Sequence, residues 1–544
     1  TGGGKLRAST LAAVGGILSN SRNRVASIVS ATALSILVIW LLTPPAEYLP
    51  EGEEPKIFAT MNAPPGYNLA AMQAIATEIE AFVQPHLQAD RAAYARGDTD
   101  MPPVAYYNMR VRPETLRVIA EPVHANDVEA LMDALSAKYR QYPGMRAFTT
   151  RGSIISSNQG GTRSINLDIA GSDLGEIYAA AQAAHRRAEE IFDNPRIRSR
   201  PGSLALAQPL LQVQPHWERA AELGLSAEAL GFMVAALTDG GYVDEFFLDD
   251  DKIDIYLYSA TGREIALEDL PQLPVYTPGG DILPLGALVD VVETVDTSSV
   301  RRVNGRRTVT LNIIPPRSVP LETGVQKVRS ELVEYLRERG EIPSRVDVVI
   351  SGAADQLDAT REALASNYLV ALLVIYLLMV AIFNHWGYPL LIITCIPIGI
   401  AGGLVGLAAL NGVGALLPVI GLGKIAQPFD MISMLGFLIL MGTVVNNPIL
   451  VVHRAVQNVH QQAMAPLAAV REAVEVRLRP IAMSTITTLF GLAPLVFIPG
   501  AGTELYRGVG VIVMFGIVGA ALVTLTMLPA LTVAVLQYQA SRNA

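Results

Sequence analysis

The most constraining feature of the sequence is a set of six apolar runs, each long enough to cross a membrane as a helix. One run stands near the start of the chain and five crowd its last third, and a long segment of polar pattern separates them. Of all residues 51% are hydrophobic and only 17% are charged, which is typical of a protein that lies partly in a membrane. We expect spans at Val25–Leu42, Tyr368–Phe383, Pro389–Leu410, Met431–Val452, Pro480–Pro499 and Gly508–Leu536.

The basic residues predict the orientation of these spans. Arg22 and Arg24 precede the first span, and Arg477 and Arg479 precede the fifth. Because cytoplasmic loops are enriched in Lys and Arg, we expect both termini in the cytoplasm and Thr43–Asn367 outside it. The net charge of −9 then belongs mainly to the outer region, so no nucleic-acid partner is expected.

The outer region has strand–helix–strand patterns, which predict α/β layers. The strand–helix–strand pattern changes near residue 223 and returns near residue 300, so one subdomain is predicted to interrupt another. The single cysteine, Cys395, lies inside the third span and excludes a disulfide within the chain. The chain begins with Thr1 instead of methionine, and we therefore expect a fragment of a longer protein.

The fourth span carries Asn446, Asn447 and Pro448 in its middle. Amides are costly in hydrocarbon unless they find a partner within the protein. A helix that served only as an anchor would not need them, so we expect a packed bundle with a polar contact at its midplane. Gly399, Gly402, Gly403 and Gly406 on the third span predict close packing against another helix.

Several motifs, in this order and spacing, resemble one half of a resistance–nodulation–division (RND) transporter of the drug-efflux branch. They are Tyr48-Leu49-Pro50 followed by Glu51 and Glu53, Phe383-Asn384-His385-Trp386, Pro397-Ile398-Gly399, Asn446-Asn447-Pro448-Ile449-Leu450, Arg477-Leu478-Arg479-Pro480-Ile481, and Gly508-Val509-Gly510. The order of one helix, a large outer domain and five helices is similar to the C-terminal half of that family.

The resemblance implies the following fold class: an α-helical membrane bundle of six transmembrane helices plus a large α/β periplasmic region of βαβ porter subdomains with an inserted docking subdomain. The expected divisions are 1–54 (lead and first helix), 55–155 (first porter subdomain), 156–222 with 301–355 (second porter subdomain), 223–300 (docking subdomain) and 356–544 (five helices).

The resemblance further implies half of a proton-driven permease in the inner membrane that exports small amphiphilic substrates. It implies contact with membrane lipid, a homotrimer, a periplasmic adaptor and an outer-membrane channel. The family places a lysine where this chain has Asn446, and an amide cannot titrate. We therefore expect the proton-carrying aspartates on the other half, with Asn446, Asn447 and Ser484 as relay partners. Alternatively, these side chains serve only as contacts between helices.

For substrate binding the resemblance points to Tyr106, Tyr107 and Met109, in a Pro/Asp/Gly-rich loop that would line the porter cleft. Aromatic and thioether side chains suit adaptable apolar contact, although packing in an ordinary core is the alternative. The sequence has no nucleophile motif, phosphate loop or zinc pattern, so we expect no enzyme, no cofactor and no metal site. Export of lipids or metal ions, and a non-transporting half-protein that acts only by association, remain open.

Overall fold

The computed structural model describes residues 2–49, 54–64, 66–152, 162–193, 195–204, 208–260, 265–296, 300–417, 425–498 and 503–543. Pro50, Glu51 and Glu53 of the first motif lie outside the described residues. The chain divides into two compact units. The first comprises Thr1–Leu204 and Arg301–Ala544, and the second comprises Ala205–Val300.

The first unit contains a helical bundle whose apolar helices confirm the six predicted spans. Two spans are each built from two consecutive helices, α12–α13 and α14–α15, and the last predicted span is divided at Thr526 between α17 and α18. The helices are α1 (Gly2–Ser19), α2 (Ser21–Leu42), α11 (Ala353–Phe383), α12 (Gly387–Ile393), α13 (Cys395–Leu416), α14 (Met431–Val444), α15 (Asn446–Gln462), α16 (Pro466–Phe497), α17 (Thr503–Leu525) and α18 (Met527–Asn543).

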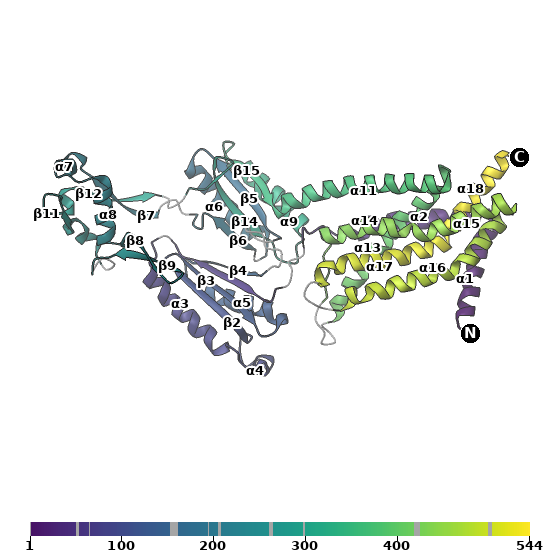
Figure 1. Cartoon of the computed structure of the whole chain (residues 1–544), viewed down its shortest axis with the longest axis horizontal. Coiled ribbons are helices and arrows are strands. Elements are labelled where there is room, and N and C mark those ends of the chain that lie inside the picture. The colour runs from purple at the N-terminus through teal and green to yellow at the C-terminus, as the bar shows by residue number, and fades with distance from the viewer. Residues whose placement is uncertain are drawn as a thin grey trace. The chain divides into compact units, whose positions relative to one another are not determined.

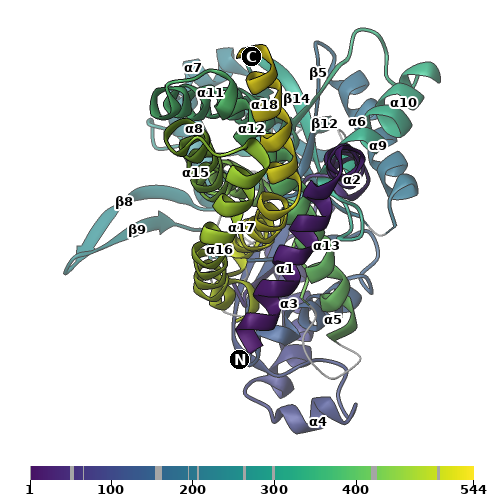
Figure 2. The ribbon, with the colours of Figure 1, turned by 90° about the vertical axis from the view of Figure 1, so that its right-hand side faces the viewer.

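Both termini lie at the end of the bundle that points away from the strands of the same unit (Figure 1). Viewed from that end, α1 crosses the bundle obliquely before the chain enters α2 (Figure 2). It packs on α16 and α18, and Arg7 forms an ion pair with Glu475 at 3.0 Å. Two termini at one end agree with an even number of membrane crossings.

The predicted glycine packing of the third span is confirmed between α13 and α17. A methyl group added at Gly402 would lie 2.9 Å from the carbonyl oxygen of Phe515, and one added at Gly406 would overlap the Phe515 side chain. Small residues therefore let these two helices approach closely.

Residues 57–151 of the first unit form an antiparallel four-stranded sheet, here called the first sheet, in the order β2-β3-β1-β4. Its core side carries Ile57, Met61 and Leu116, which pack with Ile79 and Leu135 of the covering helices. The elements are β1 (Ile57–Asn62), α3 (Leu69–Val83), α4 (Arg91–Ala95), β2 (Val104–Arg112), β3 (Thr115–Pro122), α5 (Val128–Tyr139) and β4 (Arg146–Arg151).

The second sheet combines two distant stretches of sequence. In it β14 pairs with β5, β6 and β13, and β15 pairs with β5. Its elements are β5 (Ile165–Gly171), α6 (Leu174–Ile191), β6 (Arg196–Arg200), β13 (Arg302–Val303), β14 (Arg306–Ile314), α9 (Leu321–Lys327), a π-helical segment (Val328–Glu334), α10 (Tyr335–Glu338) and β15 (Asp347–Gly352).

The second unit begins earlier than the docking subdomain predicted at 223–300. Strand β7, which the sequence reading placed in the second porter subdomain, pairs along its whole length with β12, and this pairing puts it inside Ala205–Val300. The elements are β7 (Gln208–Pro215), α7 (Trp217–Glu222), α8 (Ala227–Leu237), β8 (Gly241–Leu248), β9 (Asp251–Leu257), β10 (Pro274–Tyr276), β11 (Ile282–Pro284) and β12 (Val289–Asp296).

Candidate relay and substrate sites

Asn446 and Asn447 lie half-way along the span Met431–Gln462, where α14 gives way to α15. Pro448 has no N–H, so the carbonyl of Val444 loses its ordinary helical donor and the helix is interrupted here. The two amides have different surroundings at this break. Asn447 is 7% exposed inside the bundle, whereas Asn446 is exposed on its surface.

Ser484 is also exposed on the bundle, on α16. In the described part of the chain its side chain and that of Asn446 make no hydrogen bond to each other, so the structure does not assemble the three predicted relay residues into one site. Their neighbours are small or polar: Gly442 and Thr443 precede Asn446, and Thr487 and Gly491 follow Ser484, all exposed. A methyl group added at Gly442 or Gly491 would meet no other atom within 4 Å.

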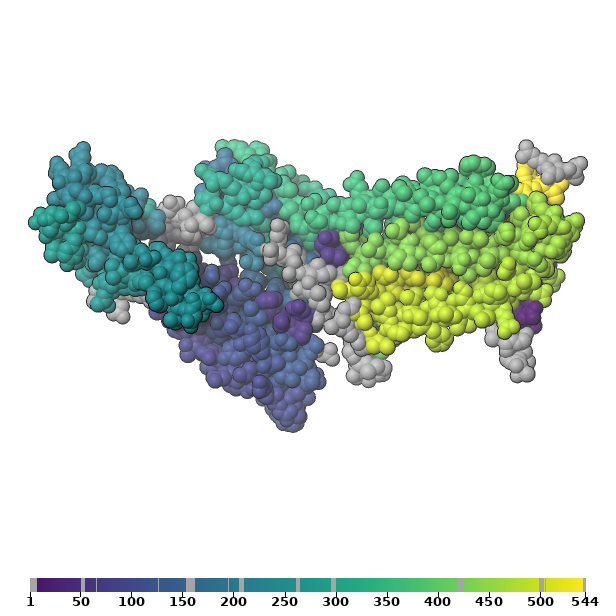
Figure 3. Space-filling view, in the orientation of Figure 1, coloured from purple at the N-terminus to yellow at the C-terminus, as the bar shows by residue number. Residues whose placement is uncertain are grey.

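Asn446 lies on the same exposed side of its span as Leu435 and Ile439, which precede it by eleven and seven residues. Helices α11 and α14 pack on each other, and their green and yellow-green surfaces lie side by side in the space-filling view (Figure 3). Leu435 and Ile439 of α14 are 43% and 50% exposed, so the amide belongs to a broad uncovered face.

A second polar group lies at the other end of α14, which we call the outer end because it adjoins the strands of the first unit. Asp430 is 0% exposed and caps α14 by accepting a hydrogen bond from the Ser433 N–H at 2.7 Å. Gln427 donates to the same carboxylate at 3.3 Å. Asn411 of α13 bonds both the N–H and the carbonyl of Gln427, at 2.8 and 3.0 Å.

Burial raises the pKa of the Asp430 carboxyl to about 6, although hydrogen bonds from Ser433 act in the opposite direction. The Glu47 carboxylate adds a smaller increase to that pKa. Glu47 itself is held by Arg163 through two bonds of 3.1 Å. A buried carboxyl with a raised pKa is therefore present in this chain, at the outer end of a span.

The sequence analysis did not identify Asp430, because only residues inside the spans were considered and Asp430 lies just before Met431. The available signal was its position, since an aspartate directly before an apolar helix is an N-cap and is held close to the helix. Arg507, in the second turn of α17, was missed for the same reason. It is 5% exposed, and its Nε has no hydrogen-bond partner among the described residues.

The three predicted substrate residues lie on a strand and not in a loop. Tyr106, Tyr107 and Met109 belong to β2, where alternation sends neighbours to opposite faces. Tyr107 and Met109 pack against the helix-side core, which agrees with the core-packing alternative for these two. Burial and the neighbouring Glu80 raise the pKa of Tyr107. Tyr106, 48% exposed on the opposite face, is the one that could meet a substrate there.

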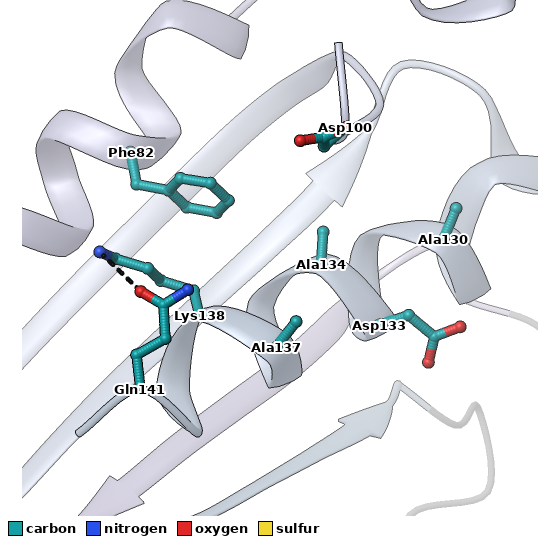
Figure 4. A pocket seen from close by; sticks show the side chains of 8 residues that line it. All are labelled: Phe82, Asp100, Ala130, Asp133, Ala134, Ala137, Lys138 and Gln141. Carbon is teal, nitrogen blue, oxygen red and sulfur yellow. Dashed lines mark hydrogen bonds between the residues drawn. The ribbon is translucent and has the colours of Figure 1, made fainter. Parts of the chain in front are cut away.

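A shallow pocket of about 560 Å³ lies on the helix side of the first sheet, between α3 and α5. In it Phe82 and Lys138 face each other, Lys138 donates to Gln141 at 3.5 Å, and Ala130, Ala134 and Ala137 follow along α5 (Figure 4). The lining residues are Phe82, Asp100, Ala130, Asp133, Ala134, Ala137, Lys138 and Gln141. It does not include the predicted substrate residues.

Among the described residues there is no group of three or more His, Cys, Asp or Glu side chains that could hold a metal ion. The acidic turn Asp249–Asp251 joins β8 and β9 in a two-stranded hairpin, with Glu245 paired to Lys252.

The sequence model of the AcrB/AcrD/AcrF family matches residues 11–536. The toluene efflux pump membrane transporter TtgB of Pseudomonas putida is 22% identical over 94% of the chain, which corresponds to 47% of that protein. The multidrug resistance protein MdtF of Escherichia coli is 24% identical over 60% of the chain and 29% of its own length.

The cobalt-zinc-cadmium resistance protein CzcA of Cupriavidus metallidurans is 26% identical over 59% of the chain and 29% of its own length. The chain thus spans about half, or less, of the length of the curated relatives that it matches.

Proposed function

Because the chain belongs to the AcrB/AcrD/AcrF family of RND efflux transporters, we propose that it supplies half of a proton-driven permease. Its cargo is small amphiphilic compounds, and it acts in an inner membrane with its two sheets and the second unit on the periplasmic side. This proposal follows the names of TtgB and MdtF, which are an efflux pump transporter and a multidrug resistance protein.

The observation that carries the proposal is the exposed amide of Asn446 half-way along a membrane span. An amide that faces lipid has no water to bond, and leaving it unsatisfied costs on the order of several kcal/mol. Another protein segment must therefore cover Asn446. The small neighbours Gly442 and Gly491, with open space above them, would let such a helix approach closely.

In this proposal a second bundle covers the face of Asn446 and Ser484 and presents a carboxylate to them. The amide N–H of Asn446 would then donate to the charged form and stabilise it, so proton binding would change which helix packing is preferred. Asn446 positions the carboxylate, and the proton itself is carried by the other half. Asp430 is a titratable group that this chain adds at the outer end.

Assembly is part of the same proposal. We expect a homotrimer that works with a periplasmic adaptor and an outer-membrane channel. The β8–β9 hairpin supports a protein contact in the second unit, because Phe246, Phe247 and Ile253 are exposed there without a covering element among the described residues.

The test is dye accumulation in cells that express the protein and in matched cells that do not. We expect lower accumulation of a neutral amphiphilic dye in expressing cells, and loss of the difference when a protonophore collapses the proton gradient. Equal accumulation in the two cell lines would support a non-transporting protein. A difference that survives the protonophore would exclude proton coupling.

Similarity to CzcA favours metal-ion export as the second candidate. In that case expressing cells would tolerate more zinc or cobalt salt than control cells, while dye accumulation would not differ.

A further inference from the structure

We propose that the shallow pocket between α3 and α5 binds a small zwitterion with an apolar body, its carboxylate at Lys138 and its ammonium group at Asp133. The pocket lies on the helix side of the first sheet and includes none of the predicted substrate residues. The inference goes beyond the proposed export function and does not depend on it.

The floor of the pocket is a row of small side chains on α5. Ala130, Ala134 and Ala137 follow one another at helical spacing on the outward side of this helix (Figure 4). The opposite side of α5 carries Leu131 and Leu135, which are buried in the core of the first sheet. The space that longer side chains would fill above the alanines is about 560 Å³, a volume in the range of small-molecule sites.

Lys138 is held in place at one side of the pocket. Its ammonium nitrogen lies 5.8 Å from the ring centre of Phe82 and 5.6 Å from that of Tyr142, and it donates to Gln141 at 3.5 Å. Tyr142 is fixed in turn, because its hydroxyl donates to Glu78 at 2.8 Å. Attraction to the faces of aromatic rings restricts a long cationic side chain. The ammonium group is therefore positioned in advance for an anionic ligand group.

Two carboxylates line the same pocket. Asp133 precedes Lys138 by five residues, which places the two side chains about 140° apart around α5, on either side of the alanines. Residues at this spacing do not face each other and cannot form the usual helical ion pair. Asp100 comes from the connection before β2 and is followed by Met101, which is 0% exposed and anchors that connection in the core.

The three charges of the pocket have no opposite charge within reach. In the described part of the chain Lys138, Asp100 and Asp133 form no ion pair, whereas Glu129 on the same helix pairs with Arg317. An ion of one sign would be attracted at one side of the pocket and repelled at the other, and an apolar molecule would use only the floor. A short apolar chain with opposite charges at its two ends can contact all three parts of the pocket, so this class of ligand fits best.

The experiment measures ligand binding to the purified protein in a nonionic detergent by saturation-transfer NMR. The probe is ω-aminohexanoate, a linear zwitterion, and the matched probes are hexanoate and hexylamine, which each keep one of its charges. Exposed ion pairs contribute little, so we expect a Kd on the order of 1 mM for ω-aminohexanoate and about threefold weaker binding of each singly charged probe. Micelles without protein give the background. Equal affinity of the three probes for the unaltered protein would overturn the proposal.

Two variants test which charge binds which end of the ligand. Lys138→Met keeps the length of the side chain and removes its charge, so it should weaken ω-aminohexanoate and hexanoate about threefold without weakening hexylamine. Asp133→Asn should weaken ω-aminohexanoate and hexylamine without weakening hexanoate. Loss of folding would instead lower the binding of all three probes. Variants that keep their thermal unfolding midpoint and affect the three probes equally, or not at all, would overturn the proposal.

A third variant tests the floor of the pocket. Ala134→Leu should abolish binding of all three probes, because the larger side chain fills the space above the alanines. The matched control is Ala74→Leu on α3, an exposed alanine that does not line the pocket, and it should change each Kd by less than about twofold. Undiminished binding by a folded Ala134→Leu protein would overturn the proposal.

Discussion

The two polar groups of α14 and α15 differ in whether the chain satisfies them. At the outer end Asn411, Gln427, Asp430 and Ser433 bond to one another and are largely buried. At the midplane Asn446 is exposed and shares no hydrogen bond with Ser484 in the described part of the chain. Both groups lie in or beside the same span, so a lipid environment alone does not explain why only the outer group finds hydrogen-bond partners within the chain.

The comparison indicates two different roles. The hydrogen-bonded groups at the outer end join α13 to the start of α14 and should affect stability when they are changed. Asn446 and Ser484, which form no hydrogen bond with each other, should hardly affect the stability of this chain when they are changed. They should affect transport once another segment covers them.

Gly508→Ala should have the largest effect. An added methyl group would overlap the Ser433 Oγ and lie 3.0 Å from the Gln427 Nε2, so α17 would have to move away from the outer group. We expect a loss of about 3 kcal/mol, in the upper range for overpacking. Hydrogen exchange of the first turns of α14 and α17 measures it.

The matched control at the midplane is Gly442→Ala, where the added methyl group meets open space. It should leave exchange unchanged or slow it slightly, because alanine favours a helix over glycine. Equal acceleration of hydrogen exchange in Gly508→Ala and Gly442→Ala would contradict the difference between the outer end and the midplane.

Asp430→Asn should stabilise the protein by about 2 kcal/mol at pH 8. The folded-state pKa of Asp430 is raised to about 6, so the folded protein holds the proton more tightly than the unfolded chain does. The free energy of unfolding therefore falls as pH rises through the interval up to about 6, and the asparagine variant escapes this loss. Thermal unfolding from pH 4 to pH 8 tests the prediction, since the variant and the wild type should converge at the acid end.

Asn411→Ala should cost about 1.5 kcal/mol, because it leaves the backbone N–H and carbonyl of Gln427 without their partners. Its thermal midpoint should fall at all pH values, in contrast to the pH-dependent change of Asp430→Asn. An unchanged midpoint would mean that water replaces both bonds and that the outer group is less enclosed than its burial indicates.

Much of this arrangement could be predicted from sequence. Apolar length identified the six spans, and the sequence places Asn446, Asn447 and Pro448 midway along the fourth, although the division of that span into α14 and α15 was not predicted. The small residues Gly402 and Gly406 predicted a close helix contact, although not that its partner would be α17. These features are local or periodic, and a single stretch of sequence therefore contains them.

Contacts between distant segments could not be predicted from the sequence. The pairing of β7 with β12 moved the boundary of the second unit, because registry between remote strands leaves no local pattern. The hydrogen bond from Arg146 of β4 to Ser199 of β6 has the same origin, since the two strands belong to different sheets. Tyr107 and Tyr106 could be assigned to opposite faces only once β2 was known to be a strand.

Asn446→Ala should have the smallest effect on stability. We expect the free energy of unfolding to change by less than about 0.5 kcal/mol, because no residue in the described part of this chain forms a hydrogen bond with the amide. Its effect on transport is the most direct test of the account. Proton-dependent dye export by cells that express Asn446→Ala should fall about tenfold, whereas Ile439→Ala, an apolar change on the same exposed face, should not alter it. Undiminished proton-dependent export by a stably folded Asn446→Ala protein would contradict the proposed role of this amide.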